Sequence, residues 1–152
     1  MNRDLRRAAV EALGALGRSD DWRDRADAGA CLAGFAEMPE AVGPLLELVL
    51  DRGDTFVTRH TAQGLLRRRD RAGLSVVASA LAVAGPNQGD WIHTAVVDVF
   101  GVLATDHAEA LRLCEELVRE ADERTALGAR HLREALAEID PALRPVRHGE
   151  AS

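Results

Sequence analysis

The sequence predicts an all-α protein, and three observations support that class. Apolar residues recur at steps of three and four along most of the chain, which is the spacing of one helix face and not the alternation of a strand. Aromatic residues make up only 3% of the chain and tyrosine is absent, whereas sandwiches and barrels favour such residues. A chain of 152 residues with 47% hydrophobic and 29% charged residues is typical of one globular domain.

Four helices are expected in the first half of the chain. The first carries apolar residues at positions 5, 8, 9, 12, 13 and 16, and Gly17 then stops it. Ser19, Asp20 and Asp21 offer an N-cap for the second helix. Pro39 opens the third, because a first-turn position makes no use of the N–H that proline lacks. The expected helices cover 5–16, a segment ending near 36, 39–50 and about 55–68.

Four more helices are expected in the second half. An Ala- and Val-rich helix precedes the segment 85–90, Gly-Pro-Asn-Gln-Gly-Asp, which is expected to be the longest loop. Asp106 is expected to cap the seventh helix and Pro141 to end the eighth. The domain is therefore expected to cover residues 1–140, with a flexible C-terminal tail over 141–152. The expected helices cover about 71–84, 91–104, 107–120 and 122–138.

The even-numbered helices repeat one pattern. Laid over one another, they place large apolar residues at Leu32, Leu65, Phe100 and Leu132, which are separated by 33, 35 and 32 residues. Two helices per period of this length predict an α-solenoid, in which each helix pair covers the apolar face of the next. Small residues at positions 28, 29, 61, 62, 128 and 129 are expected to let neighbouring helices approach closely.

Three segments resemble a known repeat family. The segment 43–51, Gly-Pro-Leu-Leu-Glu-Leu-Val-Leu-Asp, is similar to the first helix of that repeat. Asp54 and the residues after it are similar to its turn aspartate and second-helix start, and 5–17 resembles its second-helix consensus. The chain therefore resembles HEAT repeats, including the short HEAT-like repeats of the bilin-lyase type. The resemblance implies an α–α superhelix of about four HEAT-like pairs, over 4–36, 39–68, 71–104 and 107–139.

Two features depart from the pattern of that family. Thr58, His93 and Thr125 stand where the family usually has an arginine near the start of the second helix. A regular ladder of Asp–Arg contacts between pairs is therefore not expected. The first helix is similar to a second helix by sequence, so it either takes the first-helix role or begins the chain in the middle of a repeat.

In such arrays the second helices usually line the concave face, which implies a partner-binding surface there. We hypothesise that the basic members of this surface bind an acidic segment of another protein. The alternative is an ordinary solvated face with no partner. The residues expected to point outward are Arg59, His60, Gln63 and Arg67 in the second pair, Thr94, Ala95, Asp98 and Val102 in the third, and Ala126, Leu127, Arg130 and Glu134 in the fourth.

Three large aromatic residues, Trp22, Phe56 and Trp91, stand near the starts of successive second helices. As core residues they would fill the gaps between stacked pairs. As an exposed rim they would anchor a ligand, because large rings bury much area at a low entropic cost. The exposure of the rings distinguishes the two interpretations.

Charge and missing motifs argue against nucleic-acid binding and catalysis. The net charge is −6, whereas attraction to phosphates needs surplus positive charge. The arginine-rich run 67–71 is expected to interact with the negative end of its helix dipole, the alternative being an anion-binding patch. The histidines show no H-x-x-x-H spacing, and no nucleophile-elbow, Walker or dinucleotide-binding motif is present. No metal, cofactor or catalytic residue is expected.

The cysteines and the apolar runs bear on the cellular location. Cys31 and Cys114 lie far apart in apolar helical patterns, so both are expected to be buried thiols, the alternative being a disulfide or a reactive thiol. No apolar run approaches the ~20 residues that cross a bilayer, and no signal sequence is evident at the start. A cytoplasmic protein is therefore expected.

The sequence thus predicts a non-catalytic protein–protein interaction module of adaptor, regulator or toxin-neutralising type. One alternative is an accessory subunit of a lyase or isomerase that binds a small molecule, because of the resemblance to bilin-lyase repeats. Another is a nucleic-acid-binding HEAT-like protein. The end pairs of such a stack leave apolar faces uncovered, so a homodimer is a further expectation.

Overall fold

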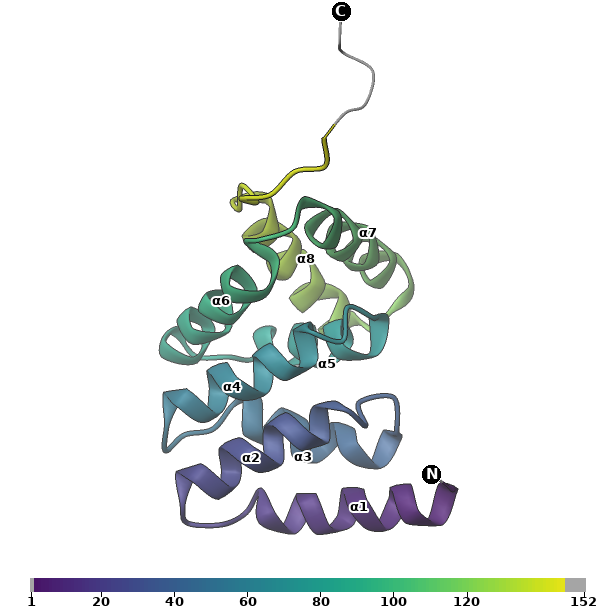
Figure 1. Ribbon diagram of the computed structural model, residues 1–152, viewed down its shortest axis with the longest axis vertical. Helices are drawn as coiled ribbons and strands as arrows, with labels where there is room; N and C mark the ends of the chain where they lie inside the picture. The colour runs from purple at the N-terminus through teal and green to yellow at the C-terminus, as the bar shows by residue number, and fades with distance from the viewer. Residues whose placement is uncertain (1, 147–152) are drawn as a thin grey trace, which may run out of the picture.

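A computed structural model describes residues 2–146 of the chain, and Figure 1 shows their arrangement. These residues form eight α-helices and one isolated parallel β-bridge, which confirms the predicted all-α class. No helix among them combines the length and the apolar character that spanning a membrane requires. The helices are α1 (Arg3–Leu16), α2 (Trp22–Ala33), α3 (Pro39–Val49), α4 (Thr55–Leu66), α5 (Arg71–Leu81), α6 (Pro86–Phe100), α7 (Ala104–Glu120) and α8 (Glu123–Ala137).

The predicted boundaries of the sixth and seventh helices are wrong, and the sixth ends at Phe100 instead of about residue 104. The expected loop over 85–90 is the first turn of α6, which begins at Pro86 with Gly85 as its N-cap. Proline is favoured at this first helical position, so the Gly-Pro pair marks a helix start and not a long loop. The seventh helix begins at Ala104, and Asp106 lies within its first turn instead of capping it. An acidic residue there still favours the helix through its dipole.

The helices pack in two rows. α2, α4 and α6 lie side by side in one row, with α2 packed on α4 and α4 on α6 (Figure 1). The other row contains α1, α3 and α5, each packed on the next odd-numbered helix. The last pair departs from this order, because α8 packs chiefly against α5 and α7 and touches α6 only lightly. Three of the four predicted second helices therefore lie side by side, and the fourth does not join their row.

Small residues set the closest approaches between helices. A Cβ atom on Gly29 of α2 would overlap the hydroxyl of Thr61 on α4 and lie 3.0 Å from the Thr61 Cβ. A Cβ atom on Gly128 of α8 would overlap the carbonyl of Ala78 on α5 and lie 3.0 Å from the Ala78 Cα. The expectation of close approach at positions 29 and 128 is therefore confirmed. The position of α8 against α5 depends on the missing side chain of Gly128.

The connections between helices are held together by charged and amide side chains at one edge. Arg25 of α2 forms a two-point contact with Asp51 after α3, at 2.9 Å for Nε–Oδ1 and 3.2 Å for Nη2–Oδ2. Its Nη1 also donates to the carbonyls of Ser19 and Asp20 at 3.0 Å. Gln88 of α6 donates to the carbonyl of Leu50 at 2.7 Å. This edge has one Asp–Arg contact followed by an amide, in keeping with the expected absence of a regular ladder.

The arginine-rich run 67–71 forms contacts at the opposite edge. Arg68 donates to the carbonyl of Ala33 at 2.9 Å and pairs with Glu37 and Asp70, both at 2.9 Å. Arg69 lies 3.3 Å from Asp106, and Arg71 pairs with Glu120. Three of the four arginines therefore tie α4 and α5 to neighbouring segments. Arg67 is the C-cap residue of α4, where a positive charge meets the negative end of the helix dipole.

The segment after α8 runs back along the connection between α6 and α7. Leu143 forms the parallel bridge with Leu103, donating to the carbonyl of Val102 at 2.8 Å and accepting from the N–H of Ala104 at 2.9 Å. Pro141 is buried. The first part of the expected tail is thus held against the α6–α7 connection, and residues 147–152 lie outside the described residues.

We expect Gly128→Ala to destabilise the protein by at least about 2 kcal/mol, because its methyl group would collide with the backbone of α5. The matched control is Gly43→Ala in the interior of α3, where a Cβ would meet nothing within 4 Å. That change should stabilise by about 0.5–1 kcal/mol, since alanine favours a helix more than glycine does. Urea unfolding of both variants measures the effects. Equal stability changes in the two would contradict the close approach of α8 and α5.

Candidate functional site

The predicted partner-binding residues of the second pair lie on the outer side of α4. Arg67 is exposed, and Arg59, His60 and Gln63 are half-buried. Arg59 makes a two-point contact with Asp98 of α6, at 2.8 Å from Nε and 3.0 Å from Nη2. Gln63 donates to the same carboxylate at 2.7 Å. Arg59, Gln63 and Asp98 therefore form one polar cluster that joins α4 to α6, and Arg67 lies close enough for its charge to act on Asp98.

The Asp98 carboxylate is stabilised in its charged form. Partial burial alone would raise the pKa of Asp98. Hydrogen bonds from Arg59 and Gln63, with the positive charges of Arg59 and Arg67, outweigh that effect and hold the pKa of Asp98 below its usual value. The hydrogen bond to Asp98 in turn raises the pKa of Arg59. Because the carboxylate neutralises Arg59, that arginine is not a free cation for an acidic partner.

Aromatic rings continue this cluster toward α2. The Trp22 and Phe56 rings meet edge to face, with centroids 5.4 Å apart and an interplanar angle of 77°. The Phe56 ring stacks on His60 at 5.1 Å and 17°. On the far side, the Arg59 guanidinium lies 5.9 Å from the centre of the Trp91 ring. We call the set Trp22, Phe56, Arg59, His60, Gln63, Trp91 and Asp98 the aromatic–polar patch, which crosses α2, α4 and α6.

The exposure of the rings favours the rim interpretation for two of them. Trp22 is 37% exposed and Phe56 is 47% exposed, although rings of this size are buried when they belong to a core. Trp91 is half-buried. Trp22 and Phe56 lie at the starts of α2 and α4 as predicted, whereas Trp91 lies within α6, which begins at Pro86. The stacking of His60 on Phe56 was not predicted. That stacking follows from the i, i+4 spacing of the two residues on one helix face.

Other predicted residues lie apart from the patch. Arg130 is exposed on α8, which packs on α5 and does not continue the row of α4 and α6. It therefore does not join Arg59 in one basic group. Ala95 and Ala126 were expected to face outward but are buried, at 0% and 5% exposure. Ala95 follows the buried Ile92 by three residues and Ala126 precedes the buried Ala129 by three, so each alanine lies on the inward face of its helix.

A hollow that the sequence did not predict lies between α6 and α8, because α8 does not pack beside α6 as α6 packs beside α4. It has a volume of 450 Å³ and lies between the start of α6 and the last turns of α8. Asp90 and His93 line it from α6, and His131 and Glu134 line it from α8. The hollow depends on the position of α8, and the repeat pattern predicted that position wrongly by placing α8 beside α6. Over the whole described range, no group of three or more His, Cys, Asp or Glu residues is arranged to hold a metal ion.

The two cysteines differ in environment. Cys114 is buried in α7, as expected, and burial raises the pKa of its thiol to about 12. Cys31 is exposed on α2, which corrects the expectation that both thiols are buried.

The comparisons with known proteins add little. No family model and no curated protein matches the chain. Among solved structures, the chain is similar to a crystal structure of an engineered protein from the Northeast Structural Genomics Consortium, with 19% identity and a TM-score of 0.34. The match covers 84% of this chain and 62% of the engineered one, so this chain spans less than two thirds of that protein. A likeness this weak carries no argument about function.

We expect one of the two cysteines to react quickly with a thiol reagent in the native protein. Cys31 is exposed, whereas the buried Cys114 thiol is held in its unreactive protonated form. Titration with a chromogenic disulfide should therefore show one fast thiol, and denaturation should release the second. The Cys31→Ser variant should lose the fast phase and Cys114→Ser should keep it. The opposite assignment would contradict the described packing of α2 and α7.

Asp98→Asn should lower stability at neutral pH and lose its effect in acid. Because the pKa of Asp98 is lowered in the folded protein, its stabilising contribution is present above the usual carboxyl pKa of about 4. That contribution disappears as the pH falls through the lowered folded pKa. Unfolding by urea at a series of pH values measures the difference between wild type and variant. A difference that stays constant down to pH about 2 would refute the assignment.

The matched control for this prediction is Asp27→Asn on α2. Asp27 is exposed and forms no ion pair among the residues that the structure covers. Its replacement should change stability much less than Asp98→Asn at neutral pH, since an isolated surface charge contributes little.

Proposed function

We propose that the chain is an α-solenoid of HEAT-like helix pairs that binds another protein and catalyses no reaction. The aromatic–polar patch is the single observation that carries the proposal. It places two exposed rings, Trp22 and Phe56, beside hydrogen-bonding groups on a surface built from three packed helices. Aromatic residues on a rigid support are the usual anchors of protein interfaces, because they bury much area and lose little entropy.

The chemistry of the patch favours aromatic anchoring over attraction to an acidic segment. Arg59 is neutralised by Asp98, and Arg130 lies on another part of the surface. Two exposed arginines remain beside the patch: the charge of Arg67 acts on Asp98, and Arg23 lies 4.8 Å from the centre of the Trp22 ring and 3.8 Å from Asp21. We therefore propose that the partner packs apolar or aromatic side chains against the exposed faces of Trp22 and Phe56 and adds hydrogen bonds at Gln63 and His60.

A reducing compartment suits this chain. Cys31 and Cys114 are both free thiols and lie on different helices. Exposed free thiols are typical of proteins that remain in the cytoplasm, where disulfides are rare. We propose that the partner is met there.

The test is capture of the partner and measurement of its affinity. The full chain is used to recover binding proteins from native lysate, and mass spectrometry identifies what co-elutes. The affinity of the purified partner is then measured for the wild type and for Trp22→Ala/Phe56→Ala. Loss of two interface anchors should weaken binding at least about 30-fold, because each anchor contributes more than about 1 kcal/mol.

The matched control is Leu127→Ala on α8. Leu127 is 41% exposed, similar to the two rings, but lies on a helix outside the row that carries the patch. Its loss should leave the affinity unchanged. Wild-type affinity in the double variant would refute the proposal.

A further inference from the structure

The apolar surface of α1 is wider than the part that α2 and α3 cover. Val10 and Gly14 are buried against the neighbouring helices, with Leu13 packed on the core. A second line of apolar residues, three and four apart, points away from the stack. Leu5 is 58% exposed and Leu16 is 38% exposed. The exposed apolar line consists of Leu5, Ala8, Ala12, Ala15 and Leu16.

This uncovered line was already part of the sequence pattern. The apolar positions that predict the first helix include 5, 8, 12 and 16, and all four are exposed in the structure. α1 lies at the end of the stack and packs on α2 and α3 from one side only (Figure 1). The sequence of α1 therefore suits a helix with neighbours on two sides, whereas the fold supplies a neighbour on one.

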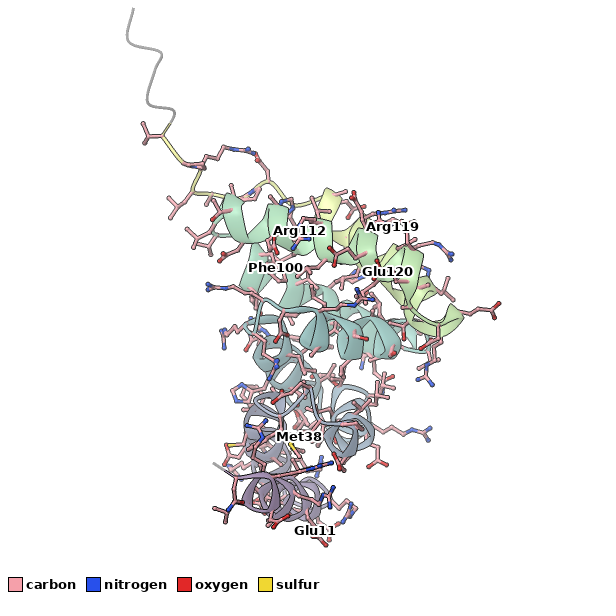
Figure 2. All side chains as sticks on the ribbon, turned by 90° about the vertical axis from the view of Figure 1, so that its right-hand side faces the viewer. Glu11, Met38, Phe100, Arg112, Arg119 and Glu120 are labelled. Atoms are coloured by element: carbon pink, nitrogen blue, oxygen red, sulfur yellow. The ribbon has the colours of Figure 1, made fainter. Side chains whose placement is uncertain are left out.

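A strip of alternating charge borders the uncovered line. Arg7, Glu11 and Arg18 lie on the α3 side of α1, where they line a hollow of 280 Å³ together with Glu40 and Pro44. Figure 2 shows Glu11 at the lower end of the molecule, on α1. Arg7 and Glu11 are both exposed and lie four residues apart, and the Arg7 guanidinium, 3.5 Å from the exposed Glu40 of α3, keeps over half of its side chain exposed. Opposite charges at this spacing are complementary to the same pair on a helix that runs the other way.

The geometry points to a second copy of this chain, packed with its α1 antiparallel to the first across a two-fold axis beside Ala8 and Ala9. In that register Leu5 of one copy lies over Ala12 of the second, so a large residue meets a small one. Arg7 of each copy then faces Glu11 of the other, and the contact occurs twice because the interface is isologous. The residues of the aromatic–polar patch lie on α2, α4 and α6 and are outside this interface.

The dimer is expected to be weak and concentration-dependent. One helix face of 14 residues on each copy supplies less area than the roughly 1,200 Å² of a stable interface. Sedimentation equilibrium of the full chain from about 5 to about 500 µM should therefore show a monomer at the low end and a dimer at the high end. A monomer over the whole range would overturn the inference.

Two sets of variants test the interface itself. Ala8→Glu/Ala12→Glu places charges on exposed positions that the fold does not need, and should weaken the dimer more than about tenfold. The matched control, Ala108→Glu on the exposed side of α7, should dimerise as the wild type does. Circular dichroism checks that each variant folds. A dimer that persists in the double variant would overturn the proposed interface.

Charge exchange tests the register. Arg7→Glu alone and Glu11→Arg alone should each weaken the dimer, because they bring like charges together across the axis. The combined variant should restore it, since the two exchanged contacts are again attractive. Failure of the combined variant to recover would overturn the antiparallel register. Trp22→Ala/Phe56→Ala should leave dimerisation unchanged, so the outcome is independent of the proposed partner-binding patch.

Discussion

The arrangement of this protein depends on how closely its helix backbones approach one another. Gly29 admits Thr61 between α2 and α4, and Gly128 admits the backbone of α5 beside α8. Each approach brings the two apolar faces together with little space between them, so both faces lose contact with water. The aromatic–polar patch and the hollow beside α8 exist because these approaches set where α4, α6 and α8 lie.

Ion pairs join helix ends and connections that the apolar core does not hold together. Arg25 and Asp51 connect the first two helix pairs at one edge, and Arg68 joins Ala33 to Glu37 and Asp70 at the other. Arg25 and Asp51 are only 16% and 10% exposed, so their loss would leave a buried charge without its partner. Many of the arginines in this acidic chain thus form ion pairs with carboxylates of the same chain. In Figure 2, the labelled charges Arg112, Arg119 and Glu120 lie instead on α7, at the outer surface.

Much of the fold could be predicted from sequence because it rests on local patterns. The apolar spacing identified every helix, and the caps at Asp21 and Asp122 mark helix starts as local rules require. The start of α6 was misjudged because a Gly-Pro pair is typical of loops and also of helix starts. The position of α8 depends on the Gly128–Ala78 approach between segments about 50 residues apart, which no local pattern encodes. For the same reason Arg59 and Asp98 were both selected as outward residues, but their pairing was not foreseen.

The bridge between Leu103 and Leu143 has a consequence for how the last pair opens. Three backbone hydrogen bonds join 101–104 to 142–143, and they close α7 and α8 into a loop of the chain. The end of α8 therefore cannot fray alone, because its release requires those bonds to break at the end of α6 as well. α6 and α8 make few direct contacts, but through these hydrogen bonds they open together. Slow amide exchange at residues 142–143 would therefore report on the end of α6 as much as on α8.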